Sequence, residues 1–155
     1  MREHHDVVVF ERASSGNATG GQGICFFPST VKILKKLSYD EDRGRPCYDT
    51  FFRHYDRNGI PTETVQLHYM EKFGVPMWSQ LRSDCRDELY RLATAPNEEA
   101  GIPNARGSVD IRHDTQVVDV DAETARLTLQ DGTNFQADMV ISKWIRLLKQ
   151  AYELM

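Results

Sequence analysis

The stretch Val7–Phe10 constrains the fold of this 155-residue chain more than any other part of the sequence. All four of its residues are apolar, three are β-branched, and the charged Glu11 and Arg12 follow directly. A half-solvated strand alternates apolar and polar residues, so a run that is apolar on both faces is typical of a buried parallel strand. The sequence therefore predicts a short parallel strand over Asp6–Phe10, buried on both sides and flanked by neighbouring strands.

Two helices are predicted from caps and apolar spacing. The first begins at Pro28, because proline suits the first helical position, and it has three apolar residues on one face: Val31, Leu34 and Leu37. The second has Ser83 as its N-cap and runs to about Ala95, before Pro96. Its apolar residues at helical spacing are Cys85, Leu89 and Leu92.

The remaining strands are predicted from alternating patterns and turn residues. The Asn-Gly pair within Asp56–Gly59 tolerates the positive φ values of a tight turn and favours an antiparallel hairpin within Tyr48–Tyr69. A strand over Ser108–His113 is followed by a three-stranded meander from Thr115 to Gln136. The apolar end of Ala137–Ile141 then suits a second buried parallel strand.

Composition argues against several classes of function. The net charge of −4 and the pI near 5.7 provide no cationic field for nucleic acid or anionic lipid. Neither a bilayer-spanning stretch nor a signal peptide is recognisable, so we expect no membrane partner and a cytoplasmic location. The cysteines and histidines are scattered without ligand spacing, so no metal site is expected.

Glu11 is the first candidate binding residue. An acidic residue at the carboxyl end of a buried strand is typical of the second strand of a dinucleotide-binding fold, where the carboxylate accepts hydrogen bonds from both ribose hydroxyls. A solvated charge at a strand end is the alternative interpretation.

Three segments, taken in order, resemble the salicylate hydroxylase and para-hydroxybenzoate hydroxylase family of FAD-dependent monooxygenases. The resemblance extends from Asp6 to Ser142. Its segments are Val8–Ala13 with Gly21–Ile24 and the helix from Pro28 to Leu37; Leu81–Leu89, with Pro76 and Trp78 before it; and the meander with Ala137–Ile141. Each segment is loose alone, and their succession is what makes the resemblance specific.

The resemblance implies an α/β fold. It would be an incomplete Rossmann-like FAD-binding fold, with a parallel sheet, a β-meander and a hairpin, helices packed on them, and the first βα unit lacking. Residues 1–142 would form a partial FAD-binding domain, with the hairpin within 48–69 belonging to a substrate-side insertion. Residues 143–155 would form a divergent, amphipathic C-terminal helix.

The resemblance also implies roles for individual residues. Glu11 would bind the adenosine ribose, Arg12 would lie beside the adenine end, and the backbone of Val117 would meet the adenine edge. Arg82 would approach the ribityl and pyrophosphate region, where a guanidinium suits anionic oxygens. Glu11 and Arg82 would face one crevice from separate strands of a single sheet. A surface arginine and a core valine are the alternatives for Arg82 and Val117, and no catalytic residue is identified.

The family's G-x-G-x-x-G turn is not found in the sequence, and Ser142-Lys143-Trp144 stands where the family has its second flavin motif. We therefore expect the chain to be a fragment of an FAD-dependent monooxygenase, truncated at both ends. Such a fragment would bind FAD weakly or not at all and would be inactive alone. NAD(P)H as reductant and a small aromatic substrate would belong to the intact family. Self-association through exposed sheet edges is expected as well.

Two other functions fit parts of the sequence. A non-catalytic remnant could dock on a partner protein through the C-terminal helix, with Trp144, Leu148 and Tyr152 as anchors. An NAD(P)-binding reductase fragment would share the strand that ends in Glu11, but it leaves the Leu81–Leu89 segment unexplained.

Overall fold

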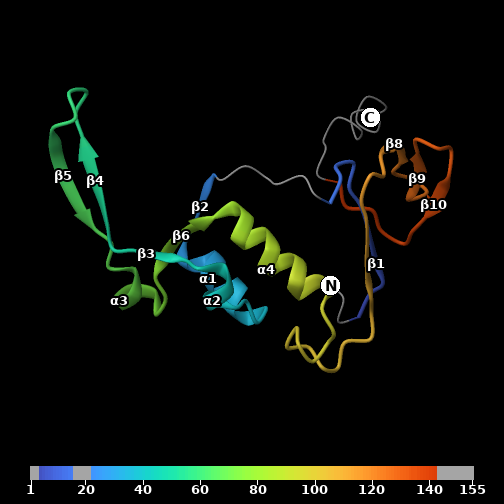
Figure 1. Ribbon diagram of the computed structural model, residues 1–155, viewed down its shortest axis with the longest axis horizontal. Helices are drawn as coiled ribbons and strands as arrows, with labels where there is room; N and C mark the ends of the chain where they lie inside the picture. The colour runs from blue at the N-terminus through green and yellow to red at the C-terminus, as the bar shows by residue number, and fades with distance from the viewer. Residues whose placement is uncertain (1–3, 16–21, 143–155) are drawn as a thin grey trace. The chain divides into compact units, whose positions relative to one another are not determined.

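The computed structural model describes residues 4–15 and 22–142, which divide into two compact units (Figure 1). The first unit comprises residues 4–6 and 22–108, and the second comprises residues 7–15 and 109–142. Among the described residues, each strand pairs only with strands of its own unit. The predicted helix over 143–155 lies outside the described residues.

The first unit is built on an antiparallel sheet with strand order β2-β6-β3, in which β2 is Gly23–Phe26, β6 is Met77–Leu81 and β3 is Cys47–Asp49. Three of its helical segments are α1 (Pro28–Lys36), α2 (Glu41–Gly44) and α4 (Arg82–Thr94). Trp78, the second residue of β6, is fully buried and packs with Val31, Leu34 and Tyr39. This cluster is the hydrophobic core of the unit.

The predicted first helix is confirmed at its start and in most of its buried face. Helix α1 begins at Pro28, and Val31 and Leu34 are buried. Leu37 is exposed, so its assignment to the buried face is wrong. The reason is that α1 ends at Lys36, which makes Leu37 its C-cap and turns the chain away from the apolar face.

The second predicted helix forms, but its cap differs. Helix α4 begins at Arg82 with Leu81 as N-cap, so the prediction of Ser83 as N-cap is wrong. The backbone leaves β6 directly into the helix and places Ser83 in the first turn. Cys85 is buried as predicted and Leu92 packs against the core, whereas Leu89 is exposed on the solvent side.

The predicted hairpin is confirmed as β4 (Phe51–Tyr55) paired antiparallel with β5 (Pro61–Gln66). It is shorter than the predicted 48–69, because Tyr48 belongs to β3 and pairs with β6. All residues of both strands are exposed, and Figure 1 shows the hairpin projecting beyond the sheet of its unit. The short helix α3 (Tyr69–Phe73) follows β5.

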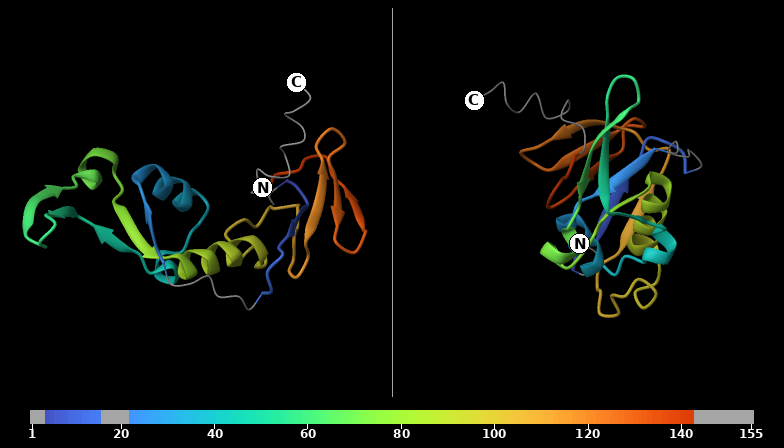
Figure 2. Two further views of the ribbon diagram at one scale, coloured as in Figure 1. Left: turned by 90° about the horizontal axis from the view of Figure 1, so that it is seen from above. Right: turned by 90° about the vertical axis from the view of Figure 1, so that its left-hand side faces the viewer.

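The second unit combines a parallel strand pair with a meander. β1 (Val7–Phe10) pairs in parallel with β7 (Val109–Arg112). Figure 2 shows the meander of β8 (Val117–Asp121), β9 (Arg126–Leu129) and β10 (Asn134–Gln136) as adjacent strands, with β9 in the middle. The parallel strand at Val7–Phe10, the strand within Ser108–His113 and the meander were predicted, whereas the pairing of β1 with β7 was not.

Side-chain rings join the two sheets of this unit. The rings of Phe10 and Phe135 have centroids 5.0 Å apart, and the guanidinium of Arg112 lies 4.9 Å from the centre of the Phe135 ring. Leu127 and Leu129 of β9 are buried. The end of β1 is thereby packed against the meander.

Two predictions about this unit are wrong. Val8 and Val9 are 44% and 40% exposed, so β1 is not buried on both sides, because β7 is its only strand partner among the described residues. Residues 137–142 form no strand, and Met139 and Ile141 are 75% and 70% exposed. Without a neighbouring strand to supply hydrogen bonds, an apolar run does not become a strand.

The fold is therefore a mixed α/β fold with parallel and antiparallel strands. The parallel part consists of β1 and β7 alone within the described residues. None of the helices in the described ranges is long and apolar enough to span a bilayer.

Candidate functional site

Three of the four predicted binding residues lie in the second unit, around the carboxyl ends of β1 and β7. Glu11 and Arg12 directly follow β1, and Val117 begins β8. The Glu11 N–H donates to the Arg112 carbonyl at 2.9 Å, and the Thr115 N–H donates to the Glu11 carbonyl at 3.0 Å. These bonds hold the segment that leaves β7 beside Glu11.

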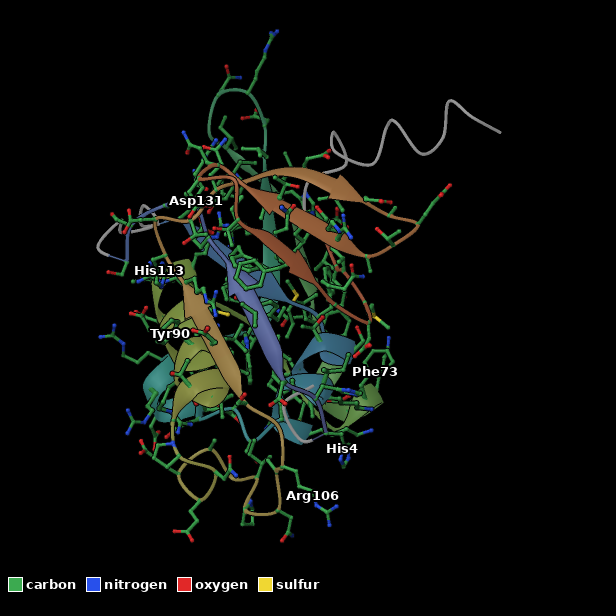
Figure 3. The ribbon with its side chains drawn as sticks, turned by 90° about the vertical axis from the view of Figure 1, so that its right-hand side faces the viewer. His4, Phe73, Tyr90, Arg106, His113 and Asp131 are labelled. Atoms are coloured by element: carbon green, nitrogen blue, oxygen red, sulfur yellow. The ribbon has the colours of Figure 1, made fainter. Side chains whose placement is uncertain are left out.

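A small polar crevice of about 270 Å³ opens at the same place. It is lined by residues from the β7–β8 connection and the end of β9: Asp114, Thr115, Gln116, Leu129, Gln130 and Asp131. Figure 3 labels His113, the last residue before the crevice, and Asp131 on its lining. Ligands of open α/β sheets bind beyond the carboxyl ends of the parallel strands, so the crevice lies where a ligand is expected.

The carboxylate of Glu11 is exposed and already oriented by the backbone. Its Oε1 accepts a hydrogen bond from the Ala13 N–H at 2.7 Å. An ionised carboxylate offers about four acceptor positions, so this bond leaves capacity for two ribose hydroxyls. The carboxylate therefore fits a ribose that donates from two hydroxyls.

Val117 lies on an edge strand, since the order of the meander is β10-β9-β8. On the outer side of β8 the backbone groups have no strand partner among the described residues. Such groups can pair with the edge of an adenine ring. The Val117 side chain is half-buried, which fits the packing alternative equally well.

The pyrophosphate half of a dinucleotide site needs backbone N–H groups, usually those at a helix N-terminus. The second unit contains no helix within residues 7–15 and 109–142. The described residues of the second unit thus offer acceptors for a ribose but no helix N-terminus for a pyrophosphate. They also bring no three His, Cys, Asp or Glu side chains together as a metal site.

Arg82, the fourth predicted residue, lies in the first unit. It is the first residue of α4, and its N–H donates to the Gln22 carbonyl at 2.9 Å. Strand β6 ends at Leu81, so the strand leads directly to this arginine at the start of the helix. The expectation that Glu11 and Arg82 come from one sheet is wrong, because β1 and β6 belong to different sheets.

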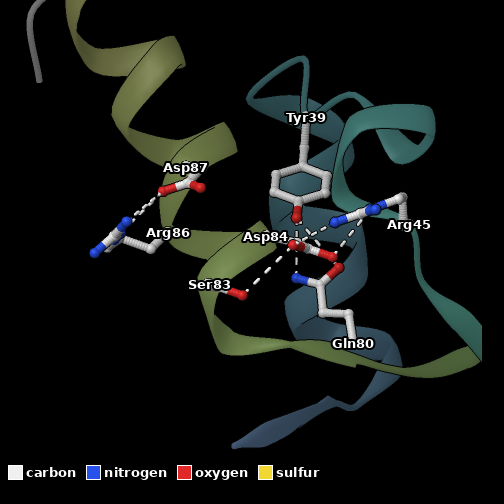
Figure 4. Close-up of polar contacts among 7 residues, drawn as sticks. All are labelled: Tyr39, Arg45, Gln80, Ser83, Asp84, Arg86 and Asp87. Atoms are coloured by element: carbon white, nitrogen blue, oxygen red, sulfur yellow. Dashed lines mark hydrogen bonds and ion pairs between the residues drawn. The ribbon is translucent and has the colours of Figure 1, made fainter. Parts of the chain in front are cut away.

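The charged groups near Arg82 are paired with one another (Figure 4). Arg45 binds Asp84 through two hydrogen bonds, Nε to Oδ2 at 3.1 Å and Nη2 to Oδ1 at 2.8 Å. Arg86 binds the neighbouring Asp87 at 2.7 Å. The exposed guanidinium of Arg82 makes no ion pair with any described residue, so it is available for an anionic ligand.

Sequence reasoning missed the buried polar network that fixes α4. Glu88 is 2% exposed and accepts hydrogen bonds from Arg91 at 2.7 Å and from the Asp40 N–H at 3.0 Å. Burial alone would raise the pKa of Glu88, but these hydrogen bonds bring it below its usual value. The i,i+3 spacing of Glu88 and Arg91 was a visible signal, whereas the contact with Asp40 depends on tertiary folding.

Tyr39 and Gln80 form the second part of this network. The Tyr39 hydroxyl and the Gln80 side-chain amide are 2.9 Å apart and buried. Burial raises the pKa of Tyr39 to about 12, so this hydroxyl stays protonated. The Glu88 part ties α4 to the backbone of Asp40, and the Tyr39–Gln80 pair ties the segment after α1 to β6.

A larger crevice of about 410 Å³ lies elsewhere in the first unit, between the start of α1 and α3. Half of its lining residues are aromatic, and none is a predicted site residue: its lining is Phe27, Pro28, Ser29, Lys32, Tyr69 and Phe73. The smaller crevice is the better candidate for a nucleotide, because polar groups that can bind hydroxyls surround it.

No protein-family model matches the sequence. No curated protein sequence matches it either. The structure, in contrast, is similar to solved structures of oxygenases. A variant of 2-methyl-3-hydroxypyridine-5-carboxylic acid oxygenase matches 86% of this chain at 23% identity, with a TM-score of 0.62.

The names of two further similar structures mention FAD. CtdE, in complex with FAD and a substrate, matches 88% of this chain at 17% identity with a TM-score of 0.61. PqsL of Pseudomonas aeruginosa, a "probable FAD-dependent monooxygenase", matches 94% at 18% identity with a TM-score of 0.59. This chain spans 31%, 31% and 39% of the oxygenase, CtdE and PqsL chains. The likeness shows that the chain has the fold of about one third of such oxygenase chains.

Proposed function

We propose that this chain is part of an FAD-dependent monooxygenase and that its second unit contributes the adenosine end of the cofactor site. The observation that carries the proposal is the position of Glu11, with its oriented carboxylate beside a polar crevice at the carboxyl ends of two parallel strands. The fold shared with CtdE and PqsL supports it.

The proposed roles follow the chemistry of each group. Glu11 accepts hydrogen bonds from the ribose hydroxyls, Arg12 lies beside the adenine end and the Val117 backbone meets the adenine edge. Arg82 binds anionic oxygens of the pyrophosphate or ribityl chain. No described residue is assigned a catalytic role, because bound FAD supplies the oxygenation chemistry once NAD(P)H has reduced it.

The proposal extends to substrate, fold and location. The substrate would be a small aromatic molecule, as the name of the pyridine-carboxylic acid oxygenase suggests for that relative. Residues 1–142 would form an incomplete Rossmann-like FAD-binding domain, and the hairpin of β4 and β5 would belong to a substrate-side insertion. We place the protein in the cytoplasm.

The chain alone should bind FAD weakly and should be inactive. The described part of the second unit has no helix N-terminus, so it provides no helical N–H groups for the pyrophosphate of a nucleotide bound at Glu11. A cofactor bound through its adenosine end alone is poorly fixed. The adenosine end can therefore be tested separately.

The test is titration of the chain with adenosine and with ADP, followed by amide NMR shifts. We expect perturbations confined to Glu11–Ala13 and Asp114–Val117, and a several-fold weaker affinity in the Glu11→Gln variant. Glutamine keeps the size of the side chain and its bond to Ala13, but it is a weaker acceptor for hydroxyls.

Glu123→Gln is the matched control. Glu123 lies in the β8–β9 turn of the same unit, and its substitution removes the same single negative charge as Glu11→Gln does. Its affinity should equal that of the wild type. The proposal fails if adenosine causes no localised shifts, or if both variants bind it as well as the wild type does.

A further inference from the structure

The Asn58-Gly59 pair lies at the tip of the β4–β5 hairpin, where the side-chain amide of Asn58 is next to the backbone nitrogen of Gly59 in the sequence. Both residues are exposed, and Gly59 has a φ of 78° with no atom within 4 Å of the place a β-carbon would occupy. Within the described part of the chain, the side-chain amide of Asn58 has no hydrogen-bond partner. An unshielded amide therefore adjoins an unhindered backbone nitrogen.

We propose that Asn58 is a site of spontaneous deamidation in the folded chain. The Gly59 nitrogen gives up its proton to solvent base and bonds to Cγ of Asn58, while the Cγ–Nδ2 bond breaks and ammonia leaves. Water then opens the resulting five-membered succinimide at either carbonyl, which gives aspartate or isoaspartate at position 58. One water is consumed and one ammonia released, and no oxidant or reductant takes part.

The other described asparagines are less reactive for structural reasons. Each of Asn97, Asn104 and Asn134 precedes a residue with a β-carbon, which crowds the attacking nitrogen. The Asn97 side chain donates to the Ala105 carbonyl at 2.8 Å, and the Asn134 side chain accepts from the Thr128 hydroxyl at 2.9 Å. Asn104, whose side chain is exposed, is the natural internal comparison.

The second turn of this kind, Asp131-Gly132, should react more slowly than Asn58 at mildly alkaline pH. Its Asp131 Oδ1 accepts a hydrogen bond from the Thr133 N–H at 2.9 Å, and that bond keeps the pKa of Asp131 below its usual value. An ionised carboxylate resists nucleophilic attack. The same glycine geometry therefore favours fast reaction where an amide precedes it.

Asp56 holds the reactive turn and should limit the rate. Its Oδ1 accepts from the Asn58 and Ile60 N–H groups, both at 2.8 Å, and its carbonyl accepts from the Gly59 N–H at 3.1 Å. The Gly59 nitrogen must leave this last bond before it attacks. Isoaspartate adds one carbon to the backbone between Asp56 and Ile60, so the pairing of β4 with β5 should be disturbed.

The test is incubation of the complete chain at mildly alkaline pH, with peptide mapping by mass spectrometry and enzymatic methylation of isoaspartate over time. We expect the peptide that contains residue 58 to gain the mass of amide-to-acid conversion several-fold faster than the peptide that contains Asn104. Asn58→Gln should abolish the isoaspartate signal, because glutamine would have to close a larger ring.

Asn104→Gln is the matched control and should leave the signal unchanged. Mapping of the wild-type chain needs no variant to fold, so it decides the matter by itself. An intact Asn58 in a sample where Asn104 has deamidated, or an isoaspartate signal that persists in Asn58→Gln, would overturn the proposal. The test is independent of cofactor binding, so it leaves the proposed function untouched.

Discussion

Arg82 is the residue whose position is hardest to explain by stability alone. It is a cation in the first turn of α4, at the positive end of the helix dipole, and it has no ion-pair partner among the described residues. We predict that Arg82→Gln raises the free energy of unfolding by about 0.3 kcal/mol, since glutamine is as good a helix former and removes the unfavourable charge. Urea denaturation measures the change.

Arg45→Gln is the comparison for this prediction. Arg45 binds Asp84 at the same end of α4, so its replacement should lower the free energy of unfolding, by a small amount because water and salt screen an exposed ion pair. A stabilised Arg82→Gln that also binds ADP more weakly would indicate an arginine used for a ligand. If Arg82→Gln instead costs as much as Arg45→Gln, the residue has a structural role.

At the scale of elements, α4 is fastened by Glu88. Glu88→Gln should lower the free energy of unfolding by about 2 kcal/mol, because the charge-assisted hydrogen bonds from Arg91 and from the Asp40 N–H lose their anionic acceptor. Asp87→Asn, one residue away on the exposed side of α4, should change it by less than about 0.5 kcal/mol. If the two variants lose the same free energy of unfolding, the buried hydrogen bonds of Glu88 contribute no more than an exposed ion pair does.

The same carboxylate gives α4 a pH dependence. The pKa of Glu88 is lower in the folded chain than in the unfolded chain, so its stabilisation is complete above the unfolded value, about 4.3, and is lost as the pH falls through the folded value. We therefore expect the wild type to lose more stability than Glu88→Gln between neutral and acidic pH. Denaturation at several pH values measures this, and parallel curves would contradict it.

The elements also show which signals in a sequence are sufficient. The start of α1 at Pro28, the turn at Asn58-Gly59 and the meander were predicted because each depends on residues close together in the chain. The sheet β2-β6-β3 was not predicted as a sheet, because it joins short strands from distant parts of the chain. The failure at Ala137–Ile141 has the same origin, since an apolar run becomes a strand only beside a partner.

The candidate site follows the same rule. Glu11 could be predicted because an acidic residue at the end of a strand is a local signal, whereas Arg12 and Val117 were predicted from the family resemblance alone. The crevice beside them was not predicted, because its lining combines the β7–β8 connection with the end of β9. The hydrogen bond between Glu88 and the Asp40 backbone could not be predicted either, because it joins residues that are far apart in the sequence.

At the scale of the whole molecule, the exposed edge and faces of β1 predict self-association. Val8 and Val9 are exposed, and β1 has an edge without a strand partner among the described residues, which is a template for pairing with another copy. We expect the apparent mass in light scattering to rise with protein concentration, and Val9→Lys to reduce the rise because a charge on an edge strand opposes pairing.

Ile33→Lys separates this mechanism from a general effect of added charge. Ile33 is an exposed apolar residue on α1, so its replacement makes the same chemical change away from any strand edge. Association that weakens only in Val9→Lys locates the contact at β1. Equal weakening in both variants would mean that scattered apolar surface drives association, and a mass independent of concentration would show that the β1 edge does not pair at all.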